Sequence, residues 1–479
     1  MKTNAEKLPS PWVSAIPLAV LTGLLYVVIR AFGGDAINGG SQIALLSATS
    51  VCVMLAIGIY RCKWAVLEEA IIDNIRASAS AIIILLLIGA IAGSWMVSGV
   101  VPTMIYYGLK ILHPSFFLVA SCAICAGVSL MTGSSWTTIA TIGVALMGIG
   151  QAMGFPEGWV AGAIISGAYF GDKLSLLSDT TVLASSTVGV GVFTHIRYML
   201  YTTVPSMLIA LGVFAVAGLA LDHGASTHAE MYAAALAATF RITPWLLVVP
   251  LATGILIARK LPAIVTLFCA AVFACIAMLL AQPELVAKVA GVGGLDFMSG
   301  FKGVLMTCFG PTAIPTGSAP LDELVATRGM AGMLNTVWLI ICAMCFGGVM
   351  TGSGMLRSLT AIFLRWVNRT FSAVASTVGA GIFFNLCTAD QYISIILSGR
   401  LFKELYAERG LEERLLSRSV EDSATVCSVL IPWNSCGMTQ ATVLGVSTFT
   451  YMPYCIFNIV SPLMSLLVAA VGWNIKRKK

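Results

Sequence analysis

The sequence predicts an all-α polytopic membrane protein, and three observations support this fold class. Of its 479 residues, 58% are hydrophobic and only 10% are charged, whereas soluble domains carry about 25% charged residues. Apolar stretches of about 20 residues recur, which is the length that a helix needs to cross a bilayer. Windows such as residues 79–97 are rich in Leu, Ile and Val and lack the alternating polarity of membrane barrel strands. The third observation is an internal repeat, in which similar segments recur about 256 residues apart along the chain.

About ten crossings of the membrane are expected, together with two re-entrant hairpins. The apolar segments 115–147 and 373–399 are each divided by a polar tip, so we expect each to enter and leave the bilayer on the same side. The long segments 157–192 and 417–450 contain polar interruptions and are expected to be broken helices. The first apolar segment is long enough to be a span and is not expected to be a signal peptide. The expected crossings are 12–30, 42–60, 77–98, 157–192, 197–221, 243–259, 262–281, 331–352, 417–450 and 452–473.

Two parts of the chain match each other when one is shifted by 256 residues. The segment "LMTGSSWTTIATIG" (130–143) then lies over "LCTADQYISIILSG" (386–399), so that Thr132 meets Thr388. Further along, "GVGVFT" lies over "GVSTFT" with the same offset. Repeated halves of this kind are typical of secondary transporters, in which the substrate binds between the repeats.

The basic residues of the loops indicate that the two repeats are inverted. Cytoplasmic loops of membrane proteins carry an excess of Lys and Arg. The segment 400–418 contains five basic residues, whereas its counterpart at 148–159 contains none, so the two are expected on opposite sides of the membrane. The basic tail at 476–479 is expected in the cytoplasm, as is the N-terminus. We therefore divide the chain into a first inverted repeat (1–222), an extracellular loop (223–242) and a second inverted repeat (243–479) with an extracellular insertion at 283–330.

Four polar interruptions divide otherwise apolar helices, two in each repeat. A broken helix within the membrane exposes backbone groups that protein, water or an ion must satisfy. Carboxylate, hydroxyl and carbonyl oxygens are also the ligands that hard cations prefer. The interruptions therefore predict cation sites. They are "TGSS" (132–135), "GDKLSLLSDTT" (171–181), "TADQ" (388–391) and "EDSATVCSVLIPWNSCG" (421–437).

Ionisable side chains at these interruptions are functional candidates, because a charge at membrane depth costs at least about 2.5–3.5 kcal/mol. Asp179 lies among hydroxyl groups with no basic neighbour in the sequence, and Asp390 lies at the tip of the second hairpin. Na⁺ is therefore expected at both carboxylates. The sequence leaves open whether Asn434 is a ligand or a helix cap. The expected ion-binding residues are Thr132, Ser134, Ser178, Asp179, Thr180, Thr388, Asp390 and Asn434.

Asp172, Lys173 and Asp422 are candidates for substrate binding or coupling. Asp172 and Lys173 belong either to a structural ion pair or to the transport machinery. Because adjacent residues of a helix point apart, we expect Lys173 to pair with an acid other than Asp172. Glu421 and Asp422 closely follow a basic loop, so a salt bridge to an arginine of that loop is an alternative to a role in transport.

These motifs are similar to those of a known family. "GDKLSLLSDTT" followed by "FTHIRYMLYTTVP", together with "TADQYISIILSGRLFKELY" and "LSRSVEDSATVCSVLIPWNSCG", resembles the NhaC-type sodium/proton antiporter family, which also includes malate/lactate exchangers. The resemblance extends from about residue 65 to about residue 465. It implies an inverted-repeat fold in which hairpins and broken helices surround a site at the membrane midplane. The family pattern has a proline where this chain has Leu176 and an asparagine where it has Val182.

These features favour a secondary antiporter that exchanges cytoplasmic Na⁺ for external H⁺ by alternating access in the cytoplasmic membrane. The altered first motif favours an alternative, a Na⁺- or H⁺-coupled exchanger of a small carboxylate or amino acid. An enzyme is disfavoured because no histidine lies at a suitable spacing from a nucleophile. No cofactor is expected beyond the transported ions. The expected partners are an ion or organic solute, membrane lipid and a second copy of the chain in a homodimer, with no nucleic acid.

Overall fold

The chain is almost entirely helical throughout the part that the structure, a computed structural model, describes. This part contains no β-strand; it has an isolated bridge between Thr312 and Thr327, and Leu411 is also in a bridge. The all-α fold expected from the sequence is therefore confirmed. The basic tail at 476–479 lies outside the described residues. The structure describes residues 8–32, 39–221, 226–259, 261–294, 296–317, 321–322, 325–365, 367 and 369–475.

Eight helices of the described chain are long and apolar enough to cross a membrane, or up to ten if each of two bent pairs forms one span. The upper number equals the ten crossings expected from the sequence, but the sets differ: α5 and α19 were expected as hairpin arms, and the expected crossings 157–192 and 417–450 are not among the candidate spans. The eight include α5 (Pro114–Thr132) and α19 (Thr370–Thr388), which are the first arms of the two expected hairpins. The other six are α1 (Pro11–Phe32), α2 (Gly40–Gly58), α3 (Trp64–Val97), α10 (Val192–Ala220), α13 (Ala263–Ala281) and α17 (Leu334–Gly352).

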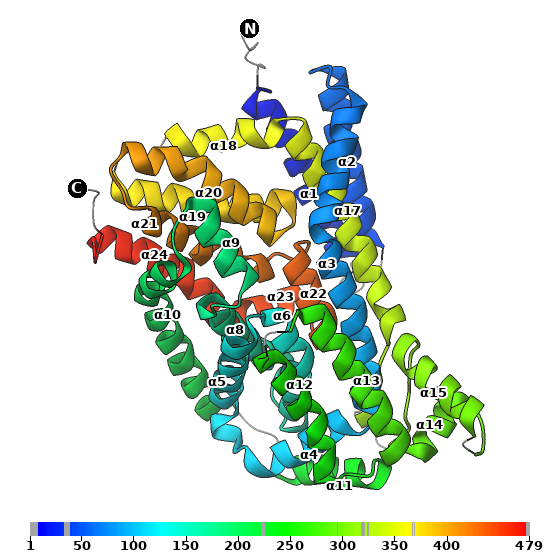
Figure 1. Cartoon of the computed structure of the whole chain (residues 1–479). Helices are drawn as coiled ribbons and strands as arrows, with labels where there is room; N and C mark the ends of the chain where they lie inside the picture. Colours follow the sequence, from blue (N-terminus) through cyan, green and yellow to red (C-terminus); the bar gives the residue numbers. More distant parts are fainter. Residues whose placement is uncertain are drawn as a thin grey trace.

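Helices α1, α2, α3 and α17 pack together along one side of the molecule (Figure 1). Their shared core contains large apolar side chains such as Leu45, Leu85 and Ile340, which are all buried. α3 begins at Trp64, so the helix starts well before the crossing expected at 77–98. The helix continues beyond its apolar part because charged residues also form good helix, as the ion pair between Asp73 and Arg76 shows.

From α5 to α9, the elements of the first repeat begin and end 256 residues before matching elements of the second, which confirms the repeat found in the sequence over this part of the chain. α8 (Glu157–Leu174) is one continuous helix, whereas the stretch that matches it is divided into three parts. The opposite orientation of the two repeats in the membrane stays a prediction. The matching elements are α5 with α19; α6 (Ser135–Thr138), η2 (Ile139–Gly143) and α7 (Val144–Ala152) with α20 (Gln391–Glu408); α8 with α21 (Glu413–Val420), η5 (Glu421–Thr425) and η6 (Ser428–Leu430); and α9 (Asp179–Val188) with α22 (Ser435–Leu444).

The remaining helices connect the repeats and cover their ends. The expected extracellular loop contains α11 (Ser226–Thr239), and the expected insertion at 283–330 contains α14 (Pro283–Ala290) and α15 (Phe297–Phe309). α4 and α11 lie at one end of the molecule, α18 and α20 lie at the other, and α6, α9, α22 and α23 lie between them (Figure 1). The other elements are α4 (Val100–Ile111), η3 (Pro244–Leu247), α12 (Val248–Ala258), η4 (Met330–Met333), α18 (Met355–Arg365), α23 (Thr448–Tyr451), η7 (Met452–Tyr454) and α24 (Ile456–Val471).

Candidate functional site

The first hairpin tip and the first broken helix meet at Gly133. α5 ends at this residue, whose φ of 68° lies in the left-handed region. Ser134 then caps α6 by accepting a hydrogen bond from the backbone N–H of Thr137. A Cβ atom at Gly133 would lie 2.6 Å from the carbonyl carbon of Leu177, which is in the break between α8 and α9. Glycine therefore both ends the helix and allows the two breaks to touch.

Asp172 connects the same two breaks through its side chain. It is buried near the end of α8. Its Oδ2 accepts hydrogen bonds from the backbone N–H (3.0 Å) and the hydroxyl (2.7 Å) of Ser135, the first residue of α6. Sequence reasoning did not single out Ser135, although it is the last residue of the motif "TGSS". The feature of the sequence that could have identified Ser135 is its position directly after a helix break, where a backbone N–H lacks an intrahelical partner.

Thr132 and Thr388 form matching hydrogen bonds in the two hairpin tips. The Thr132 hydroxyl donates to the carbonyl oxygen of Ser134, and the Thr388 hydroxyl donates to that of Asp390, each over 3.2 Å. Each of these threonine oxygens also lies 3.2 Å from the hydroxyl oxygen six residues further along the chain. Both threonines therefore stabilise the turn at a tip, and their role as ion ligands stays a prediction.

Asp390 has the same connecting role in the second repeat that Asp172 has in the first. Its Oδ1 caps α20 by accepting hydrogen bonds from the backbone N–H groups of Tyr392 (2.9 Å) and Ile393 (3.0 Å). Its Oδ2 accepts from the hydroxyl of Ser435 over 3.2 Å, at the start of α22. A carboxylate at these positions is favoured because it satisfies N–H groups that have no intrahelical partner.

Asn434 acts as a helix cap in the structure. Its Oδ1 accepts from the backbone N–H of Cys436 over 3.1 Å, at the start of α22. Its Nδ2 donates to Oδ1 of Asn385 over 3.1 Å, and Asn385 in turn donates to the carbonyl oxygen of Ala424 over 2.6 Å. Asn385 was not singled out from the sequence, since it lies within an apolar helix. Ion binding by Asn434 stays a prediction.

Ser178, Asp179 and Thr180 lie at the start of α9. Ser178 caps this helix, and its hydroxyl oxygen lies 3.0 Å from that of Thr180. The side chain of Asp179 is exposed, so the carboxylate that contacts the first hairpin tip is Asp172. The phenol of Tyr392 lies within electrostatic range of both aspartates and of a third carboxylate at the second tip. Na⁺ binding at Asp179 stays a prediction.

A buried ion pair joins the two repeats. Lys173 and Asp422 are fully buried and bond to each other through Nζ and Oδ1. The same Nζ donates to the hydroxyl of Ser461 over 3.1 Å, and Thr202 donates to Oδ1 of Asp422 over 3.1 Å. Lys173 therefore pairs with an acid of the other repeat and not with its neighbour Asp172. Because both charges are buried, removal of either one would leave the other without compensation in an apolar environment.

Arg418 and Glu421 extend this group of buried charges; the sequence had placed Arg418 in the basic loop and had left Glu421 between a salt bridge to that loop and a role in transport. Arg418 Nε lies 3.8 Å from Oδ2 of Asp422, and its guanidinium lies 4.7 Å from the centre of the Tyr198 ring. Both Arg418 and Glu421 are fully buried. The salt bridge expected between these acids and an arginine of the basic loop is present at Asp422 and Arg418, and the packing of α21 against its neighbours buries it.

The buried charges around the breaks are predominantly acidic. Two of the six are basic and four are acidic, so this part of the described chain contains two more acidic than basic groups. A carboxyl group in an apolar interior is stable only when it is protonated or when donors or cations compensate its charge. The centre is therefore suited to protons and cations. The six residues are Asp172, Lys173, Asp390, Arg418, Glu421 and Asp422.

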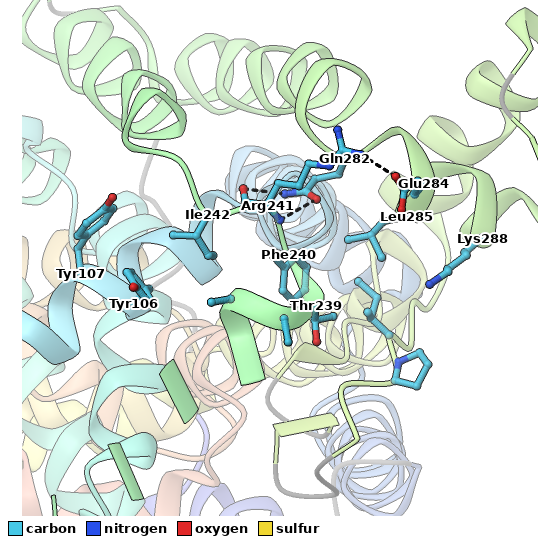
Figure 2. A pocket seen from close by; sticks show the side chains of 14 residues that line it. Tyr106, Tyr107, Thr239, Phe240, Arg241, Ile242, Gln282, Glu284, Leu285 and Lys288 are labelled. Atoms are coloured by element: carbon cyan, nitrogen blue, oxygen red, sulfur yellow. Dashed lines mark hydrogen bonds and ion pairs between the residues drawn. The ribbon is translucent and has the colours of Figure 1, made fainter. Parts of the chain in front are cut away.

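A surface pocket of about 580 Å³ lies elsewhere, where α4, α11 and α14 meet. Figure 2 shows that Arg241 and Gln282 exchange hydrogen bonds at this pocket and that Arg241 also pairs with Glu284. The Arg241–Glu284 pair is exposed, and such pairs contribute only about 0–1 kcal/mol. None of the residues predicted to bind ions lines the pocket. We therefore place the candidate site at the breaks.

Repeated broken helices around a buried, predominantly acidic centre define a secondary transporter. Comparison with known proteins gives the particular family. The chain belongs to the Na⁺/H⁺ antiporter family, whose sequence model matches residues 167–473.

Several characterised relatives are similar over nearly the whole chain. The Na⁺/H⁺ antiporter NhaC of Alkalihalophilus pseudofirmus is 35% identical over 90% of this chain and 90% of its own length. The malate-2H⁺/Na⁺-lactate antiporter of Bacillus subtilis is 34% identical over 90% of this chain and 89% of its own. The arginine/ornithine antiporter ArcD of Halobacterium salinarum is 32% identical over 99% and 95%, respectively. These relatives are all antiporters.

Proposed function

We propose that this chain exchanges cytoplasmic Na⁺ for external H⁺ across the cytoplasmic membrane. The observation that carries the proposal is the excess of two buried carboxyl groups around the breaks. These groups need positive charge, and protons and Na⁺ both supply it. A carboxylate that holds either a proton or Na⁺, but not both, couples the two fluxes through competition alone. The match to the Na⁺/H⁺ antiporter family supports this choice of ions.

The geometry of the two breaks supports alternating access. Asp172 and Asp390 each connect a hairpin tip to a broken helix, so movement of a tip changes the surroundings of a carboxylate directly. The hairpins move against the outer helices and open the centre to one side at a time. The exposed carboxylate of Asp179 attracts cations at the entrance to the first break. We assign Na⁺ at Asp179 and at Asp390, with hydroxyl groups of the breaks as further ligands.

Exchange of a small carboxylate or amino acid is the second candidate, because relatives include malate/lactate and arginine/ornithine antiporters. The buried basic groups argue against it. Lys173 bonds to Asp422 and Ser461, and Arg418 lies beside the same aspartate. Lys173 cannot receive the carboxylate of a substrate without first breaking a buried interaction. The guanidinium N–H groups of Arg418 have no hydrogen-bond partner among the described residues, but an anion that approached them would meet Asp422, whose Oδ2 lies 3.8 Å from Nε. This arrangement favours ions as the transported species.

The proposed function includes a membrane topology. Both termini lie in the cytoplasm, the repeats 1–222 and 243–479 have opposite orientations, and the segments 223–242 and 283–330 face outward. The basic segment 400–418 supports this orientation. The chain acts as a transporter and not as an enzyme, its surface contacts membrane lipid, and two copies associate as a homodimer.

Transport by reconstituted protein tests the function. Proteoliposomes are given a pH difference and then a Na⁺ pulse, and collapse of the difference is followed with a pH-sensitive dye. We expect Na⁺ to collapse the gradient, with no effect of an equal choline pulse and none in protein-free liposomes. Uptake of labelled malate, lactate and arginine is measured in the same vesicles. Uptake of one of these solutes without any effect of Na⁺ on the pH difference would reject Na⁺/H⁺ exchange.

A further inference from the structure

Glu421 differs from the other buried carboxyl groups of the described chain, because neither of its oxygen atoms has a hydrogen-bond partner. Asp172 accepts two hydrogen bonds at the start of α6, and Asp390 accepts three at the starts of α20 and α22. Asp422 accepts from a lysine and from two hydroxyl groups. These donors stabilise three carboxylates in their charged form. Protein donors do not stabilise Glu421 in this way.

Two hydroxyl groups lie close enough to the carboxyl group of Glu421 to interact with it, although neither carboxyl oxygen has a partner in the described chain at the distance and angle of a hydrogen bond. Thr425 lies on the same π-helical turn, and Thr180 lies at the start of α9. The Thr425 hydroxyl is also buried and without a partner. The charged groups nearest on α8 are Lys173 and Asp172, which have opposite signs, and the lysine already pairs with another carboxylate. The site therefore contains several oxygen ligands, and the buried basic residues Lys173 and Arg418 lie against Asp422 and form no hydrogen bond to Glu421 in the described chain.

The first repeat shows that the fold does not require a carboxyl group at this place. The residue 256 positions before Glu421 is Ile165, which is fully buried in the regular part of α8. Thr425 corresponds to Tyr169 in the same helix. The second repeat replaces this apolar α-helical turn with a π-helical turn, and such turns are frequent at functional sites. A role in packing alone would be better served by the apolar residue.

We propose that Glu421, Thr425 and Thr180 form a Na⁺-binding site that is separate from the two hairpin tips. The carboxylate supplies the negative charge, and hydroxyl oxygens are suitable additional ligands for a hard cation. Thr180 belongs to the first repeat and the π-helical turn to the second, so a bound ion connects the two repeats. The choice of Na⁺ as the cation rests on the proposed function. The site would respond directly when α9 moves relative to η5.

Na⁺ binding to the purified full-length protein tests this site, with isothermal titration calorimetry in detergent at one fixed pH. Glu421→Gln removes the charge and Thr425→Val removes one hydroxyl, and each nearly preserves the shape. Glu284→Gln serves as a matched control, because that carboxylate is exposed and distant in sequence from the breaks. Because Na⁺ is also assigned at Asp179 and Asp390, the titration is fitted with separate sites. We expect the affinity of one site to fall about tenfold or more in Glu421→Gln, to fall less in Thr425→Val, and to stay unchanged in Glu284→Gln.

Wild-type Na⁺ affinity in a monodisperse Glu421→Gln protein overturns the proposal, and so does a wild-type chain that binds no Na⁺. If Glu421→Gln yields no folded protein, unchanged affinity in Thr425→Val overturns it instead. Transport in proteoliposomes separates this result from the proposed function. Na⁺/H⁺ exchange by the wild type, together with unchanged affinity in Glu421→Gln, rejects the site and keeps the function. If Glu421→Gln loses Na⁺ binding but the wild-type protein does not exchange Na⁺ for H⁺, the site is supported and the proposed function is rejected.

Discussion

The two broken helices of this protein occupy equivalent places in the repeats but carry different charges. α8 is regular to its end, where Asp172 and Lys173 lie. The equivalent stretch of the second repeat changes from α-helix to π-helix and then to a 3₁₀ turn, and it carries Arg418, Glu421 and Asp422 nearer its start. If the two repeats were identical, matching positions of the two helices would carry the same charge. Because the repeats differ, Lys173 of the first repeat can pair with an acid of the second.

The hairpin tips, by contrast, are nearly identical in their local structure. Each tip has a residue with positive φ, Gly133 or Ala389, followed directly by a capping residue, Ser134 or Asp390. The comparison shows that the repeat determines the backbone breaks, whereas departures from the repeat determine where charge is buried. Interactions that the two repeats share are therefore expected to affect stability, and unshared ionisable groups are expected to affect ion binding.

The largest effect is expected for Asp422→Asn, which leaves the buried ammonium group of Lys173 without its charged partner. Breaking a buried ion pair on one side costs about 3–5 kcal/mol, so the yield of monodisperse protein should fall sharply. Fluorescence-detected size-exclusion chromatography measures this yield. A double variant, Lys173→Met with Asp422→Leu, removes both charges and should recover much of the folded protein. Normal folding of Asp422→Asn alone would contradict the importance of the pair that joins the repeats.

An intermediate effect is expected at the paired tip positions, with opposite signs in the two repeats. Gly133→Ala places a Cβ atom against Leu177 at a positive φ, and such strain costs about 1–3 kcal/mol. Ala389→Gly relieves a positive φ of 56° and should change stability by no more than about 1 kcal/mol. Thermal unfolding of both variants in detergent measures the difference. Equal stability of Gly133→Ala and Ala389→Gly would show that the two tips are not packed as the structure describes.

The smallest effect is expected for Asp179→Asn. The carboxylate is exposed in the first turn of α9, where a negative charge contributes about 0.3–1 kcal/mol. We expect normal folding and only a several-fold loss of apparent Na⁺ affinity, less than for Glu421→Gln, in the calorimetric titration. Na⁺-driven collapse of a pH difference should persist in proteoliposomes. Complete loss of this exchange would instead make Asp179 the coupling carboxylate.

The sequence analysis located the breaks well because their causes are local. Gly133 and Ser134 end one helix and cap the next through bonds to nearby backbone, and such signals are contained in a few adjacent residues. The internal offset similarly predicted that the helices of the two repeats would match. The start of α3 at Trp64 could not be read from the crossing expected at 77–98, since hydropathy marks the apolar part of a helix and not the point where its hydrogen bonds begin.

The sequence by itself determined the class of protein, the repeat and the positions of the polar breaks, because composition, periodicity and capping act over short distances. Only the tertiary structure decided which buried groups meet. Lys173 and Asp422 are 249 residues apart, and the sequence offered several acids as partners. The burial of Glu421 without a donor likewise depends on elements from both repeats packing around one turn. In an apolar interior the energy of a charge depends on its neighbours in space, and the fold alone selects those neighbours.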